Sequence, residues 1–69
     1  MERVLDVFDR LACMVDAQTG VVECKCRDTR MTASLGPGES CRIERDLAVT
    51  TVSRMSGGDW KVTRMRQDA

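Results

Sequence analysis

The first twenty residues carry their apolar side chains at intervals that fit one side of an α-helix. At about 100° per residue, the apolar positions from Met1 to Val15 fall together, and Gly20 follows as a residue that can end a helix in the left-handed conformation. The stripe covers about half of the circumference, more than the roughly 100° that a helix needs to lie on one core. We therefore predict an amphipathic helix over about residues 2–18, with part of its apolar side in a homodimer or partner contact. The residues predicted for this contact are Val4, Val7, Leu11 and Met14.

After Gly20 the pattern changes to a period of two, as in a strand that is buried on one side. Val22, Cys24 and Cys26 share one face, and the charged residues between them share the other. The apolar positions of the next segment, RMTASL, are out of phase with Cys26. A turn or bulge is therefore expected near Asp28 and Thr29.

Two glycine-containing turns divide the rest of the chain. In LGPGES, Pro37 and Gly38 suit the central positions of a type II turn, and we expect a hairpin there. SCRIERDLAVTTVSRM is either one long bent strand or two strands divided at residues 44–46, and SGGD turns the chain into a last strand with Trp60 and Val62 on the inner face.

These elements predict an α+β fold in a single domain over residues 1–69. The N-terminal helix would pack on a four- or five-stranded antiparallel meander sheet over about residues 21–66, or plug one end of a small curled barrel. A chain of 69 residues buries only ~60% of the surface that its unfolded form exposes, so its core is marginal. A partner subunit, a metal or a disulfide would add stability.

Charge and hydropathy restrict the partners. Eleven basic and eleven acidic residues cancel, which argues against binding to duplex DNA or an anionic membrane by bulk charge. Charges interrupt the apolar residues of MERVLDVFDR, so no signal peptide or membrane span is expected. We expect a cytoplasmic protein with reduced cysteines.

The four cysteines leave three interpretations open. The alternation directs Cys24 and Cys26 inward as small hydrophobic side chains, which is the favoured interpretation. A zinc site would need every cysteine of this chain, because it contains no His, and a disulfide such as Cys26 to Cys41 would join neighbouring strands. Cys13 falls on the polar side of the predicted helix, among carboxylates that disfavour a thiolate. The alternative metal ligands are Cys13, Cys24, Cys26 and Cys41.

No arrangement of residues indicates catalysis. The chain lacks His and Tyr, and its paired acids, such as Asp6 with Asp9, fit a solvated face or a turn. The glycine turns do not lead from a strand into a helix, so they do not resemble phosphate-binding loops. We expect no enzymatic activity and no cofactor.

The outer face of the predicted sheet is basic. Such a face can bind RNA or single-stranded DNA, although those sites usually add exposed aromatic side chains, and Trp60 is expected to point inward. The residues predicted for this alternative are Lys25, Arg27, Arg30, Arg42, Arg54 and Lys61.

The leading hypothesis is a small cytosolic protein-interaction or regulatory protein, an adaptor, inhibitor or subunit, with a phage or mobile element as a candidate source. It would act by docking onto a macromolecular partner. Its motivation is the missing catalytic chemistry together with the wide apolar stripe of the predicted helix. The alternatives are a nucleic-acid-binding module and a zinc-stabilised mini-domain.

Overall fold

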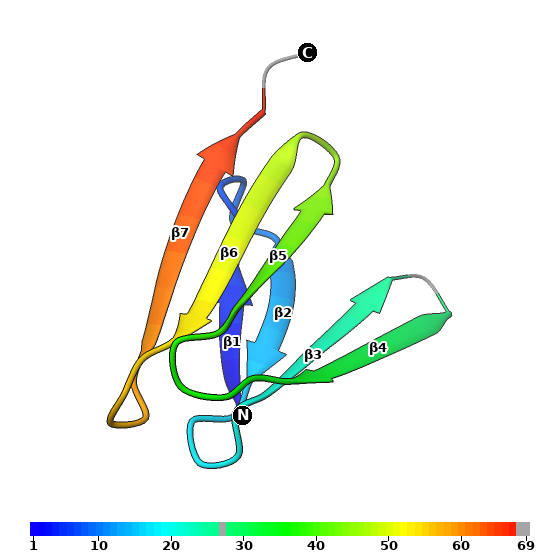
Figure 1. Ribbon diagram of the computed structural model, residues 1–69. Coiled ribbons are helices and arrows are strands. Elements are labelled where there is room, and N and C mark those ends of the chain that lie inside the picture. Colours follow the sequence, from blue (N-terminus) through cyan, green and yellow to red (C-terminus); the bar gives the residue numbers. More distant parts are fainter. Residues whose placement is uncertain (27, 68–69) are drawn as a thin grey trace.

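Seven antiparallel strands in two sheets make up the fold (Figure 1). The computed structural model describes residues 1–26 and 28–67, apart from the side chain of Cys26. The strands are β1 (Glu2–Leu5), β2 (Leu11–Val15), β3 (Val21–Cys26), β4 (Thr29–Ser34), β5 (Ser40–Arg45), β6 (Ala48–Arg54) and β7 (Trp60–Arg66). One sheet has the order β1-β2-β3-β4 and the other β5-β6-β7. The described residues contain no helix, hence none with the length and apolar character to cross a membrane.

The predicted N-terminal helix is wrong, and with it the α+β fold class. Residues 2–15 form the β1–β2 hairpin, in which Val4 lies opposite Cys13. The apolar residues of this segment fit both periods, because Leu11, Cys13 and Val15 also alternate along a strand. The Asp6 carboxylate accepts hydrogen bonds from two backbone N–H groups of the turn, which stabilises the hairpin in place of a helix.

The predicted change to strands after Gly20 is confirmed, with corrections to the connections. Gly20 has a positive φ of 78°, as expected, but it closes the β2–β3 hairpin and ends no helix. The turn predicted near Asp28 and Thr29 is confirmed, since a new strand, β4, begins at Thr29. SCRIERDLAVTTVSRM forms two strands, the second of the predicted alternatives, and they are joined at Asp46 and Leu47. The turn at Pro37 and Gly38 carries the chain from one sheet to the other and forms no hairpin.

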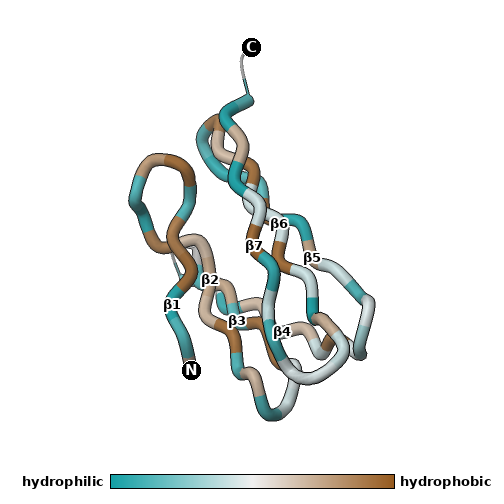
Figure 2. The backbone as a smooth tube through the Cα atoms, turned by 90° about the vertical axis from the view of Figure 1, so that its left-hand side faces the viewer, coloured by the Kyte–Doolittle hydropathy of each residue, from teal (hydrophilic) through white to brown (hydrophobic). Residues whose placement is uncertain are grey.

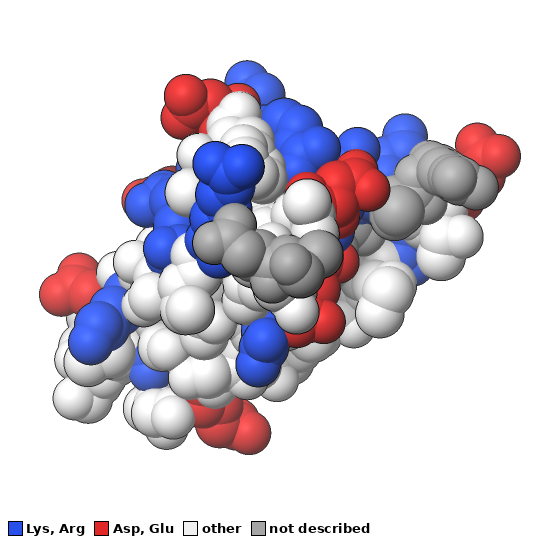
Figure 3. All heavy atoms as spheres, turned by 90° about the horizontal axis from the view of Figure 1, so that it is seen from above, with Lys and Arg blue, Asp and Glu red and all other residues white. Residues whose placement is uncertain are grey.

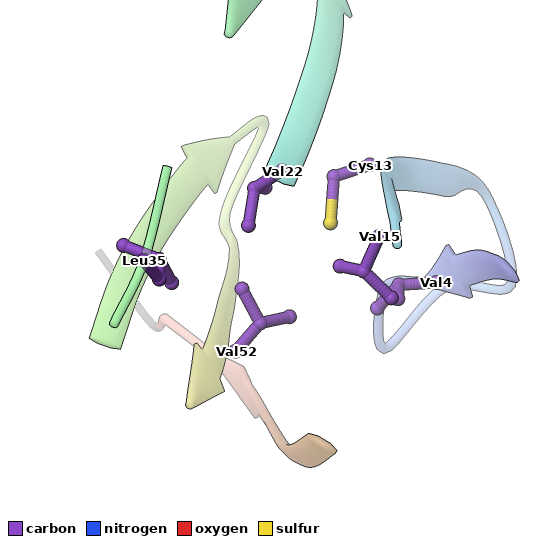
Figure 4. Close-up of a cluster of buried hydrophobic side chains, with 6 residues drawn as sticks. All are labelled: Val4, Cys13, Val15, Val22, Leu35 and Val52. Atoms are coloured by element: carbon purple, nitrogen blue, oxygen red, sulfur yellow. The ribbon is translucent and has the colours of Figure 1, made fainter. Parts of the chain in front are cut away.

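The two sheets bury a common core of small side chains (Figure 4). Its buried members point toward one another from both sheets, and they are Val4, Cys13, Val15, Val22, Leu35 and Val52. Trp60 and Val62 pack against this cluster, which confirms their predicted inner face. Cys13 is only 2% exposed, so its predicted place on a polar helix surface is wrong.

A junction of three residues, Gly20, Leu35 and Arg54, holds the two sheets together where the chain passes from β4 to β5. The backbone N–H of Leu35 donates to the Gly20 oxygen at 2.8 Å, and Arg54 Nη1 donates to the Leu35 oxygen at 2.8 Å. A Cβ added at Gly20 would collide with the Arg54 guanidinium and the Leu35 carbonyl. The junction therefore needs glycine both for its positive φ and for its lack of a side chain.

Substitution of Gly20 tests this junction. Gly38→Ala serves as the matched control, because Gly38 has a similar φ of 84° with no atom near the added Cβ. The backbone strain alone costs about 1–2 kcal/mol, and crowding adds about 1–3 kcal/mol at Gly20. In urea unfolding we expect Gly20→Ala to lose clearly more stability than Gly38→Ala. Equal losses would show that the junction is not closely packed.

Candidate functional site

One end of the molecule brings together three segments that are distant in sequence. They are the β1–β2 turn (Asp6–Arg10), the β5–β6 turn (Arg45–Ala48) and the C-terminal end of β7 (Arg64–Arg66), and together we call them the tip surface. Arg10 bridges the two turns, since its Nη1 lies 3.4 Å from Asp46 Oδ2 and its Nη2 donates to the Arg45 oxygen at 3.4 Å. Arg64 Nε donates to the Leu5 oxygen at 2.7 Å.

The Asp6 carboxylate organises the first of these turns. Its Oδ1 accepts the backbone N–H groups of Phe8 at 2.8 Å and Arg10 at 3.0 Å, while its Oδ2 accepts Arg10 Nε at 3.1 Å. The side chain is only 3% exposed. Its desolvation acts to raise the pKa of this carboxyl, but these hydrogen bonds and the Arg10 charge outweigh it and lower the pKa below the ordinary 3.8. Arg10 is thereby held in place to reach the second turn.

Backbone strain is concentrated at the tip surface. Among the described residues, the non-glycine residues with positive φ are Asp9 (62°), Asp46 (46°) and Leu47 (68°), and all three lie in its two turns. Asp46 and Leu47 occupy the central positions of a two-residue hairpin turn of type I′, which normally takes Asn-Gly or Asp-Gly. A leucine at the second position is strained by about 1–2 kcal/mol. Strain of this kind is often found at functional sites.

Apolar side chains and arginines share the tip surface. Leu47 is 51% exposed and Phe8 is 40% exposed, and Val7 beside Phe8 is also exposed. The guanidinium groups of Arg10 and Arg66 lie 5.1 and 5.9 Å from the centroid of the Phe8 ring. Figure 2 shows the hydrophobic colours in the β1–β2 turn, and Figure 3 looks down on this end, where basic and acidic groups are interspersed. Arginine and aromatic residues are the types enriched in protein interfaces.

The residues predicted for a partner contact do not form one face. Val4 is buried in the core, and Met14 is partly buried on β2. Val7 and Leu11 are exposed at and next to the β1–β2 turn. The structure therefore brings only the second pair to the same end of the molecule, and it adds Phe8, which the sequence analysis did not select.

The predicted basic residues are also dispersed. Lys25 and Arg30 lie opposite each other on the outer face of the first sheet, whereas Arg42 and Lys61 lie on the outer face of the second. Arg54 is partly buried and bonded to the Leu35 oxygen. Arg27 lies outside the described residues. Among the described residues, the predicted basic residues therefore do not form one patch.

The three described thiols gather on the inner side of the fold. Cys13, Cys24 and Cys41 are free cysteines, and the side chain of Cys26 is not among those described. Burial, the neighbouring Cys24 and Cys41, and a hydrogen bond between the Cys13 and Cys24 thiols raise the pKa of Cys13 to about 12. Partial burial also raises the pKa of Cys24. In residues 1–26 and 28–67, no group of three His, Cys, Asp or Glu side chains is arranged to hold a metal ion.

The residues that sequence reasoning missed are Phe8, Arg10, Leu47, Arg64 and Arg66. A local signal was present in DVFDR, where an aspartate precedes residues whose backbone it can bond, as in an Asx turn. RDLA contains no glycine, so the sequence left a turn here only as one of two alternatives and did not indicate a two-residue hairpin.

The pH dependence of stability tests the role of Asp6. Because its pKa is lowered on folding, its contribution is complete above the unfolded value of 3.8 and is lost as pH falls through the folded value. We expect Asp6→Asn to lower the urea midpoint at neutral pH and to flatten the fall in stability from about pH 5 to 2. Asp9→Asn changes another carboxylate of the same turn and should leave the slope as in the wild type. An unchanged slope in Asp6→Asn would contradict this role.

Alkylation tests the buried thiol. With its pKa raised to about 12, Cys13 forms almost no thiolate at pH 8, and it is also inaccessible. In the folded protein, iodoacetamide should modify Cys13 at least about a hundredfold more slowly than the partly exposed Cys41. The two rates should converge in urea. Similar rates in the folded state would show that Cys13 is not in the core.

Comparisons with protein-family models, with curated proteins and with solved structures gave no match to this chain. The function is therefore argued from the geometry of the tip surface and the chemistry of its residues.

Proposed function

We propose that this chain is a small cytoplasmic interaction protein, an adaptor, inhibitor or regulatory subunit, that docks onto a partner protein through the tip surface. The observation that carries the proposal is the strained and exposed Leu47 in the β5–β6 turn, which Arg10 links to the turn that carries the exposed Phe8. A glycine at position 47 would satisfy the same turn without strain. The leucine side chain lowers stability and leaves its apolar surface in water, so a partner contact is the benefit that explains it.

The arginines indicate the chemistry of the partner. Arg10 and Arg66 lie near the Phe8 ring, and Arg10 and Arg64 donate hydrogen bonds to backbone oxygens of the tip surface and of the adjoining Leu5. Fixed guanidinium groups at the rim of an apolar patch favour a surface that places carboxylates next to hydrophobic residues. The partner would therefore present an acidic segment with one or two apolar side chains.

Two observations favour a protein over a nucleic acid. The Phe8 ring already has two guanidinium groups near its centroid, so stacking on a base would have to displace them. The acidic side chain of Asp46 also lies in the same surface, bonded to Arg10, where it would oppose phosphate groups.

Site-specific photocrosslinking tests this function. A photoreactive phenylalanine analogue replaces Phe8 in the full chain, and in the control it replaces Thr32, which is exposed on β4, on the outer face of the first sheet and away from the tip surface. In extracts of cells that express the protein, we expect one protein adduct from position 8 and none from position 32. The adduct should persist after nuclease treatment.

The same assay with Leu47→Gly separates function from folding. This variant should be about 1 kcal/mol more stable to urea, because glycine adopts positive φ without strain. It should nevertheless give the position-8 adduct at least about fivefold less efficiently. Met55→Ser removes an exposed apolar side chain at the opposite end and should leave the adduct unchanged. An adduct that tolerates Leu47→Gly, or that nuclease removes, would refute docking of a protein at the tip surface.

A further inference from the structure

Strand β5 offers an unpaired edge to solvent. Within the described sheets its neighbour is β6 alone. The backbone N–H of Arg54 donates to the Glu39 oxygen at 2.9 Å, and hydrogen-bonded pairs alternate along an antiparallel ladder, so residues 41, 43 and 45 bond to β6. The residues between them therefore turn their backbone N–H and C=O groups toward the open edge. They are Ser40, Arg42 and Glu44.

Charged side chains line one side of this edge. On the outer face of the sheet, Arg42 Nη2 lies 2.7 Å from Glu44 Oε1, and both side chains are more than half exposed. The two residues are separated by Ile43, whose side chain points to the inner face. The strand thus carries one positive and one negative charge at adjacent outward positions.

An apolar hollow lies on the other side of the same edge. It has a volume of about 370 Å³, and its apolar walls include Cys41 and Ile43 from β5 with Cys24 and Met31 from the β3–β4 hairpin. Met31 is 67% exposed. Figure 1 shows the β3–β4 hairpin diverging from β5.

We propose that β5 pairs with β5 of a second copy of this chain, antiparallel and centred on Ile43, to form a continuous six-stranded sheet. This contact is separate from the tip surface and does not depend on the function proposed above. Two copies joined in this way would carry two tip surfaces, so a partner with two acidic segments would be bound with increased avidity.

The charges select this register over its neighbours. The outward backbone groups belong to residues 40, 42 and 44, so hydrogen-bonded pairs between the copies must join even-numbered residues. A register centred on Arg42 would place the two Arg42 side chains opposite each other, and a register centred on Glu44 would do the same with the two Glu44 carboxylates. Like charges directly opposite each other are unfavourable. Centring on Ile43 places each Arg42 opposite Glu44 of the second copy, giving two cross-strand ion pairs.

The same register fills the hollow. Side chains directly opposite in a sheet point to the same face, so Ile43 of the second copy lies on the inner face beside Ile43 of the first copy. There it contacts the apolar wall that includes Cys24 and Met31. The pairing also covers the open backbone groups of β5, which are otherwise a site for unspecific strand association.

Charge reversal tests both the dimer and its register. By sedimentation velocity at concentrations up to roughly 0.5 mM, we expect wild-type protein to dimerise reversibly, and Arg42→Glu or Glu44→Arg to weaken the dimer by more than about tenfold. The double variant R42E/E44R should dimerise like the wild type. A mixture of the two single variants should form a heterodimer. In that heterodimer, both acidic residues of one copy face both arginines of the other copy. Lys61→Glu, on the opposite edge strand β7, is the control and should leave the dimer intact.

Amide hydrogen exchange provides a second measurement on the wild-type protein. The backbone N–H groups of Arg42 and Glu44 should become protected as concentration rises, while that of Ile43, bonded to β6, should be protected throughout. A monomer at the highest concentration, or a dimer that both single reversals leave intact, would overturn the proposal. A dimer that the single reversals weaken but R42E/E44R does not restore would overturn the register. Neither result would affect crosslinking at position 8, so the two proposals fail separately.

Discussion

The N-terminal half of this fold depends on one buried carboxylate. Asp6 accepts two backbone N–H groups of the turn that follows it and the guanidinium of Arg10. This bonding reverses the chain, so that Val4 and Cys13 face each other across the β1–β2 hairpin. Because Arg10 also reaches Asp46, the same carboxylate fixes the position of this hairpin against the β5–β6 turn. One local set of hydrogen bonds therefore connects the turn, the core and the tip surface.

The core of this protein is small, which explains where its apolar residues lie. Its buried members are valines, a leucine and the Cys13 thiol, and neither aromatic residue is fully buried. Phe8 lies instead at the tip surface, and Met31 lies beside the open edge of β5. Apolar area that would stabilise the interior of a larger protein is thus left at two separate surfaces, and each can be covered by another chain.

The two surfaces differ in how they can recognise a partner. The edge of β5 provides regularly spaced backbone groups, and in the proposed pairing its specificity would come from the order of Arg42, Ile43 and Glu44. The tip surface relies on side chains that two strained turns hold in position. Strain at Leu47 lowers stability in the free protein, as is common where a residue is retained for binding.

The sequence by itself determined the strands after Gly20, the positive φ of that glycine, the turns near residues 37 and 57, and the inner face of Trp60. These features depend on local alternation and on the conformational freedom of glycine, which are visible in one strand or turn at a time. The cysteine pair of β3 follows the same alternation, and its described member, Cys24, packs against the core.

Only the tertiary structure decided the conformation of the first fifteen residues and the location of the candidate site. Their apolar positions satisfy both a helix and a hairpin, and even Asp6 and Arg10 have the i, i+4 spacing of a helical ion pair. The choice was made by burial against the second sheet, where Val4, Cys13 and Val15 meet Val52. The tip surface arises from turns nearly forty residues apart, joined by Arg10 and Asp46, and no local pattern encodes that contact.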